Sequence, residues 1–168
     1  EGVKIITIRR PQAMNALNDE MTDEILAVLK RFADDPDVKG FVLTGYGTTA
    51  FSAGADIGKF PSMLGDPDAS AQYARDCAKV QMFMDQMDKP VVAAVNGLAL
   101  GGGLEIAIRC HGMVATKNAT LQFPEISLGI LPGIGGCVVP YRNWPQGPAL
   151  FHEMISLARP VGSEEPAG

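Results

Sequence analysis

Residues 91–109 read VVAAVNGLALGGGLEIAIR, and this stretch decides the fold. Its beginning, Val91–Val95, is short, wholly apolar and rich in β-branched residues, which predicts a buried strand. Asn96 and Gly97 then turn the chain, and the glycines that follow open a predicted helix over 104–109. A strand, a glycine-rich turn and a helix in this order are typical of an α/β fold.

The three glycines at 101–103 leave the predicted helix start without side chains. The unpaired N–H groups of a first helical turn, with the helix dipole behind them, suit an oxygen that gains negative charge. A tight crossover that needs small residues only for packing would leave the same pattern, so both interpretations stand. The run lacks the spacing and downstream acid of a dinucleotide fingerprint and the Gly-Lys-Ser/Thr of a phosphate loop.

A second small-residue turn lies upstream. Residues 41–44 predict another buried strand, and the segment 51–57, FSAGADI, follows it after a glycine-containing loop. If the two strands are neighbours, both turns lie at one edge of a sheet, where open α/β sheets place their ligands. Two main-chain donors that point at one oxygen are what an oxyanion hole requires.

Two glutamates lie in glycine-rich, apolar surroundings: Glu105 in GGGLE and Glu125 in FPEISLG. Little water around a carboxyl raises its pKa and suits the group to proton transfer near neutral pH. Addition of water across a double bond requires such a pair, in which one group gives a proton while the other takes one. The pair therefore predicts an enzyme.

Composition narrows the function classes. The chain has 168 residues, 46% of them hydrophobic, which predicts one domain with a real core. A net charge of −5 argues against a nucleic-acid partner, and no apolar run reaches the ~20 residues of a membrane span. Three unpaired cysteines predict free thiols in a reducing compartment, the cytoplasm or an organelle matrix. Without a His/Asp/Cys cluster at ligand spacing, we expect no metal.

Four segments, taken together, resemble the crotonase (enoyl-CoA hydratase/isomerase) superfamily. They are RRPQAMNALN (9–18), FSAGADI (51–57), AVNGLALGGGLE (94–105) and PEISLGILPG (124–133). The resemblance implies a crotonase-like ββα spiral core within a single α/β domain over 1–168. The core would span 1–136, and the segment 137–168 would depart from the family, with its C-terminal helical region missing or truncated.

The resemblance also implies site residues and a ligand, an acyl-CoA thioester, with no cofactor beyond the coenzyme A of the substrate. Ala55 and Gly102 would supply the two oxyanion N–H groups, and Glu105 and Glu125 would be the catalytic carboxylates. The residues implied to bind substrate or coenzyme A are Ala53, Asp56, Ile57 and Gly101. Arg9, Arg10 and Lys59 flank these motifs, where they would meet coenzyme A phosphates or remain solvated surface charges.

We therefore expect a 2-enoyl-CoA hydratase. A Δ3,Δ2-enoyl-CoA isomerase or related lyase, and a non-catalytic acyl-CoA-binding or assembly module, remain as alternatives. The resemblance implies a homo-oligomer, a trimer or hexamer. A predicted helix over 149–157 carries an apolar stripe, and little of the remaining chain can cover it. We therefore also expect the chain to self-associate or to bind the remainder of a longer parent polypeptide. The stripe consists of Phe151, Met154, Ile155 and Leu157.

Overall fold

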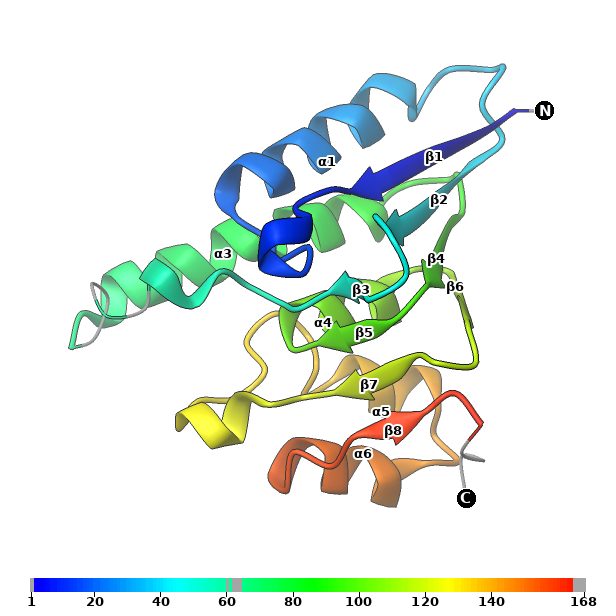
Figure 1. Cartoon of the computed structure of the whole chain (residues 1–168). Helices are drawn as coiled ribbons and strands as arrows, with labels where there is room; N and C mark the ends of the chain where they lie inside the picture. The colour runs from blue at the N-terminus through cyan, green and yellow to red at the C-terminus, as the bar shows by residue number, and fades with distance from the viewer. Residues whose placement is uncertain (1, 60, 62–64, 165–168) are drawn as a thin grey trace.

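A computed structural model describes residues 2–59, 61 and 65–164, and two four-stranded sheets organise this part of the chain (Figure 1). The first sheet is parallel throughout. In spatial order it contains β1 (Val3–Ile8), β2 (Gly40–Gly45), β4 (Val91–Val95) and β6 (Gly112–Ala115). The second contains β3 (Ala50–Ser52), β5 (Leu98–Leu100), β7 (Thr120–Gln122) and β8 (Val161–Gly162). Its strand β8 runs antiparallel to β7.

The helices lie between strands of the two sheets in the sequence. They are α1 (Asp19–Phe32), α3 (Pro67–Met84), α4 (Gly102–Arg109), α5 (Val139–Asn143) and α6 (Pro148–Ser156). Short 3-10 turns occupy Pro11–Ala13, Ile57–Lys59 and Glu125–Leu128. Asn18 caps α1, because its side-chain oxygen accepts a hydrogen bond from the Met21 N–H at 3.0 Å. Within the described residues, no helix is long and apolar enough to cross a membrane.

The chain repeats one ββα turn. Each turn enters the first sheet, continues into the second and returns through a helix: β2, β3 and α3, then β4, β5 and α4. Because successive turns stack, β2 pairs with β4 and β3 pairs with β5. Figure 1 shows β3, β5, β7 and β8 one below another, with α4 behind β5. The expected ββα spiral and the expected neighbouring strands are both confirmed.

Asn96 and Gly97 form the corner between the two sheets. The Asn96 amide donates to the Gly45 and Gly47 carbonyls at 2.9 and 2.6 Å. Its oxygen accepts from the Gly45 N–H at 3.0 Å. A Cβ on Gly97 would lie 2.4 Å from the Thr49 carbonyl oxygen, so only glycine fits there. The corner therefore joins the end of β4 to the end of β2 and sets the course of β5.

The C-terminal helix α6 corrects one expectation. Its apolar stripe was expected to be uncovered, but Met154 is only 3% exposed. The Phe151 ring packs against Trp144, at 5.9 Å between centroids, and against Tyr141, at 6.2 Å. Only Leu157, 71% exposed, remains in water among the four residues of the stripe. The segment that follows α5 folds back onto the core, and sequence periodicity alone did not indicate this.

Candidate active site

Ala55 and Gly102 lie side by side at the ends of neighbouring strands. An ideal Cβ on Gly102 would lie 3.4 Å from the Ala55 nitrogen. Leu17 holds Ala55 from the other side, because the Leu17 N–H donates to the Gly54 carbonyl and the Leu17 carbonyl accepts from the Asp56 N–H, both at 2.7 Å. In such a parallel bridge the N–H of Ala55 points away from Leu17. No acceptor among the described residues is bonded to it.

Glycine occupies each of the three positions 101–103 at the start of α4 for a different reason. Gly101 has φ +48°, and a Cβ there would lie 2.7 Å from the Glu125 Oε1. A Cβ on Gly103 would lie 2.6 Å from the Ser52 carbonyl oxygen. At Gly102 the nearest atoms are at 3.4–3.8 Å, an ordinary contact distance. Packing therefore explains Gly101 and Gly103, whereas Gly102 keeps open a space beside two main-chain donors.

Glu105 lies on α4 and is 3% exposed. Its Oε1 accepts hydrogen bonds from the N–H groups of Ile134 and Gly136, at 2.9 and 2.8 Å. Burial raises the pKa of this carboxyl, while the backbone hydrogen bonds act in the opposite direction. The loop over 134–136 therefore orients Glu105 and favours its ionised form.

Glu125 lies on the 3-10 turn after β7 and is 7% exposed. Its Oε2 is buried and has no hydrogen-bond partner among the described residues. Burial, with a smaller contribution from the charge of Glu105, raises the pKa of Glu125 to about 7. The two carboxyls therefore differ: backbone donors offset part of the effect of burial at Glu105, whereas burial brings the pKa of Glu125 to about 7.

These groups face one cavity of about 310 Å³. Ala55, Gly102, Glu105 and Glu125 all line it, so the structure brings together the four residues predicted to be catalytic or oxyanion-binding. Residues of α3 and of the loop over 130–134 form the remaining wall, and none of them was predicted as a site residue. They are Ser70, Tyr73, Ala74, Cys77, Ile130, Leu131, Gly133 and Ile134.

A second cavity, of about 370 Å³, adjoins the first through Ala55, Glu125 and Ile130. All four residues implied to bind substrate or coenzyme A line it: Ala53, Asp56, Ile57 and Gly101. The two cavities thus lie side by side, and Ala55 and Glu125 line both of them. Such a shape suits a long ligand whose reacting group lies between its two ends.

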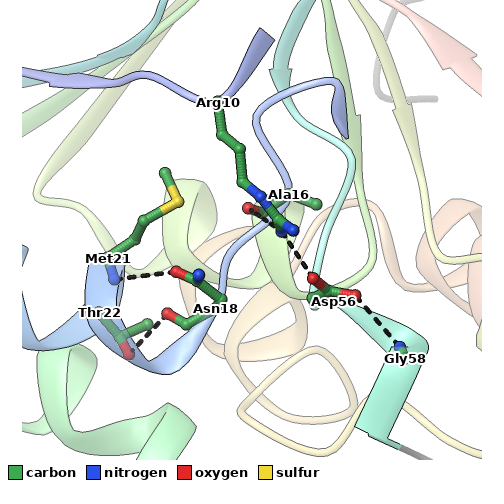
Figure 2. Close-up of polar contacts among 7 residues, drawn as sticks. All are labelled: Arg10, Ala16, Asn18, Met21, Thr22, Asp56 and Gly58. Atoms are coloured by element: carbon green, nitrogen blue, oxygen red, sulfur yellow. Dashed lines mark hydrogen bonds and ion pairs between the residues drawn. The ribbon is translucent and has the colours of Figure 1, made fainter. Parts of the chain in front are cut away.

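The flanking cations have specific partners. The Arg9 guanidinium lies over the Tyr46 ring, 4.5 Å from its centroid. The Arg10 guanidinium forms an ion pair with Asp56, with Nη1 2.7 Å from Oδ2 (Figure 2). The side chain of Lys59 lies outside the part that the structure describes. Arg10 is therefore engaged with a residue of the second cavity.

Comparison with known proteins identifies the family. The family model described as enoyl-CoA hydratase/isomerase matches residues 1–167. This chain belongs to that family. The match includes residues 137–167, which were expected to depart from it.

Individual relatives agree with this assignment. The chain is 38% identical to a crotonyl-CoA hydratase of Syntrophomonas wolfei, over 98% of this chain and 62% of the relative. It is 42% identical to a mitochondrial enoyl-CoA hydratase of Pongo abelii, over 97% of this chain and 54% of the relative. A crystal structure of an enoyl-CoA hydratase from Polaromonas superposes with a TM-score of 0.89 at 27% identity. The superposition covers 97% of this chain and 63% of that structure's chain. The chain thus spans about half to three-fifths of the length of these family members.

Proposed function

We propose that this chain carries the active site of a 2-enoyl-CoA hydratase, which adds water reversibly to a trans-2-enoyl-CoA to give a 3-hydroxyacyl-CoA. The observation that carries the proposal is the unequal pair of carboxyls in one cavity. Glu105 accepts hydrogen bonds from two backbone N–H groups, which favour its ionised form, and burial raises the pKa of Glu125 to about 7. The names of the relatives, crotonyl-CoA hydratase and short-chain-enoyl-CoA hydratase, support the same reaction.

We infer different catalytic roles for Glu105 and Glu125 from their different environments. The thioester oxygen accepts hydrogen bonds from the N–H groups of Ala55 and Gly102, which stabilise the enolate as charge moves onto that oxygen. Glu105 orients a water molecule and takes its proton as the oxygen attacks the β-carbon. Glu125, protonated at neutral pH, delivers its proton to the α-carbon. The proton counts balance, because Glu105 gains one and Glu125 loses one in each hydration.

A spectroscopic assay tests the proposal. Crotonyl-CoA is incubated with the chain, and hydration is followed as loss of the enoyl-thioester absorbance. We expect turnover that falls at least 100-fold in both Glu105→Gln and Glu125→Gln, the ordinary size of a general acid–base contribution. Glu24→Gln, on the exposed surface of α1, is the matched control with unchanged turnover. Undiminished turnover in either active-site variant would remove that residue from the mechanism.

The same assay separates the alternatives. A 3-enoyl-CoA that is converted to the 2-enoyl isomer, while crotonyl-CoA is not hydrated, would identify an isomerase. Acyl-CoA binding without either reaction would identify a binding module. Hydration needs an activated water and a proton donor, so a pair of differently tuned carboxyls favours the hydratase.

We also propose a homo-oligomer, as the resemblance implies. The exposed apolar residues that support this proposal lie near the site and not on α6. They are Ile126, Leu128, Ile130 and Leu131, which are between 38% and 63% exposed. Light scattering at micromolar concentration is expected to give a mass above the 17.8 kDa of one chain. A monomer with full activity would contradict this proposal and leave the hydratase proposal intact.

A further inference from the structure

Arg10 and Asp56 join two segments that lie 46 positions apart in the sequence. Arg10 follows β1, and its Nη1 donates to Asp56 Oδ2 at 2.7 Å and to the Ala16 carbonyl at 3.5 Å (Figure 2). The other oxygen of Asp56, Oδ1, accepts from the Gly58 N–H at 3.1 Å. The Asp56 carboxylate therefore bridges a cation on one side and the 3-10 turn over 57–59 on the other.

The backbone of Arg10 is itself anchored. Its N–H donates to Asn15 Oδ1 at 3.0 Å. The Asn15 side chain, 1% exposed, donates to the carbonyls of Tyr46 and Ala50, at 3.0 and 2.8 Å. Because these bonds fix Arg10 relative to the start of β3, the ion pair transmits that position to Asp56. It is not a pair of freely moving surface side chains.

Asp56 directly follows Ala55, the residue whose N–H faces Gly102. The Leu17 carbonyl holds the Asp56 N–H at 2.7 Å, and Arg10 holds the Asp56 side chain. The Ala55 N–H itself belongs to the peptide that Ala55 shares with Gly54, whose carbonyl accepts from the Leu17 N–H at 2.7 Å. Ala55 therefore lies between two neighbours that are both held, Gly54 by Leu17, and Asp56 by Leu17 and Arg10. An oxyanion donor acts only when it is aimed at the place where the charge develops, and a displacement of about 1 Å can reduce the rate about 100-fold.

The pair also has an electrostatic consequence. Asp56 is the next residue after Ala55, whose N–H is proposed to stabilise a developing enolate. A carboxylate that Arg10 neutralises opposes formation of a second negative charge nearby less than one that has lost Arg10.

We propose that Arg10 is a positioning residue for the reaction: through Asp56 it aims the Ala55 N–H, and it neutralises the carboxylate beside the oxyanion. This inference rests on the proposed hydratase function. It differs from the expectation that Arg10 meets coenzyme A phosphates, because the guanidinium contacts Asp56 of the enzyme and not the substrate. The two assignments predict opposite kinetic effects, since loss of a positioning residue lowers kcat and loss of a phosphate contact raises KM.

The test is a double-mutant cycle with crotonyl-CoA as substrate. Arg10→Gln is expected to lower kcat about 10- to 100-fold, with KM within about twofold of wild type. Arg10→Lys keeps the charge and loses the planar fork, so it is expected to retain more activity than Arg10→Gln. Combining Arg10→Gln with Asp56→Asn removes the carboxylate that has lost Arg10, and we expect kcat to recover above that of Arg10→Gln alone. Arg31→Gln, on the exposed surface of α1 and stacked on Phe32, is the matched control with wild-type kcat.

A second readout does not require turnover. Acetoacetyl-CoA, bound with its carbonyl in the oxyanion hole, shows the ultraviolet absorbance of its enolate, and we expect a smaller enolate fraction in Arg10→Gln than in wild type. Wild-type kcat in Arg10→Gln with a raised, salt-dependent KM would overturn the inference and make Arg10 a phosphate contact. Losses that are strictly multiplicative in the double variant would overturn it as well. If wild type neither hydrates crotonyl-CoA nor binds acetoacetyl-CoA, the proposed function has failed, a result distinct from these.

Discussion

Glu125→Gln is expected to stabilise the fold at alkaline pH while it abolishes hydration. The pKa of Glu125 is raised from 4.5 to about 7 by burial, and Oε2 has no partner within the described residues. A carboxyl with a raised folded-state pKa contributes stability that is present below the unfolded-state pKa and is lost as pH rises through about 7. At 1.36 kcal/mol per pH unit, ionisation of this group disfavours folding by about 3 kcal/mol.

The assay compares unfolding of wild type and Glu125→Gln in urea at pH 5 and at pH 8. Glutamine does not titrate, so the difference in unfolding free energy between the two proteins isolates the Glu125 carboxyl. It is expected to shift by about 2.5 kcal/mol in favour of the variant between the two pH values. Trp144, the only tryptophan in the chain, reports unfolding by fluorescence, and circular dichroism provides a second probe.

Glu24→Gln is the matched control for stability as well. Its carboxylate lies in water on the exposed surface of α1, so the variant and wild type are expected to differ equally at both pH values. A difference between Glu125→Gln and wild type that is also the same at pH 5 and pH 8 would refute the argument. Glu125 would then ionise as readily in the folded protein as in the unfolded chain, and its role as the acid would lose its physical basis.

Three further predictions concern the same site. The kcat/KM for hydration is expected to fall as pH rises above about 7, because Glu125 must carry its proton, and a rate profile that stays flat to pH 9 would contradict this. Gly102→Ala is expected to leave the circular dichroism spectrum unchanged and to lower kcat at least 100-fold, since the methyl group fits but fills the space beside Ala55 N. Tyr73→Ala, at the α3 wall of the cavity, is expected to raise kcat/KM for a 2-decenoyl thioester relative to crotonyl-CoA, and an unchanged ratio would place the acyl tail elsewhere.

The longer elements could be predicted from the sequence because their patterns repeat over many residues. Val91–Val95 is a strand with the predicted bounds, and the predicted helix over 149–157 corresponds to α6, Pro148–Ser156. The strands β3 and β5 have three residues each and could not be predicted in this way. They are too short for an alternating pattern, and pairing with a neighbouring strand determines their structure.

In the candidate site, too, some features could be predicted from the sequence and others could not. Side-chain identity predicted the two glutamates, and a strand-to-helix turn predicted the donors. However, α4 begins at Gly102, two residues before the predicted start, so Gly102 and Gly103 belong to its first turn. The hydrogen bonds to Glu105 come from a loop 29 to 31 positions away, and no local pattern indicates them. The unequal environments of the two carboxyls therefore became visible only in the folded structure.

The spiral explains why these groups meet at all. The second sheet presents the ends of β3, β5 and β7 as neighbours, and Ala55, Gly102 and Glu125 each follow one of these ends by two or three residues. Adjacent strands lie about 4.8 Å apart, a spacing at which two N–H groups can both reach one oxygen at about 2.9 Å. The third turn enters through Pro124, which has no N–H, and supplies a carboxyl at the equivalent place. One structural position, repeated in three successive turns, thus places two main-chain N–H groups and a carboxyl around one space, as the proposed hydration of a thioester requires.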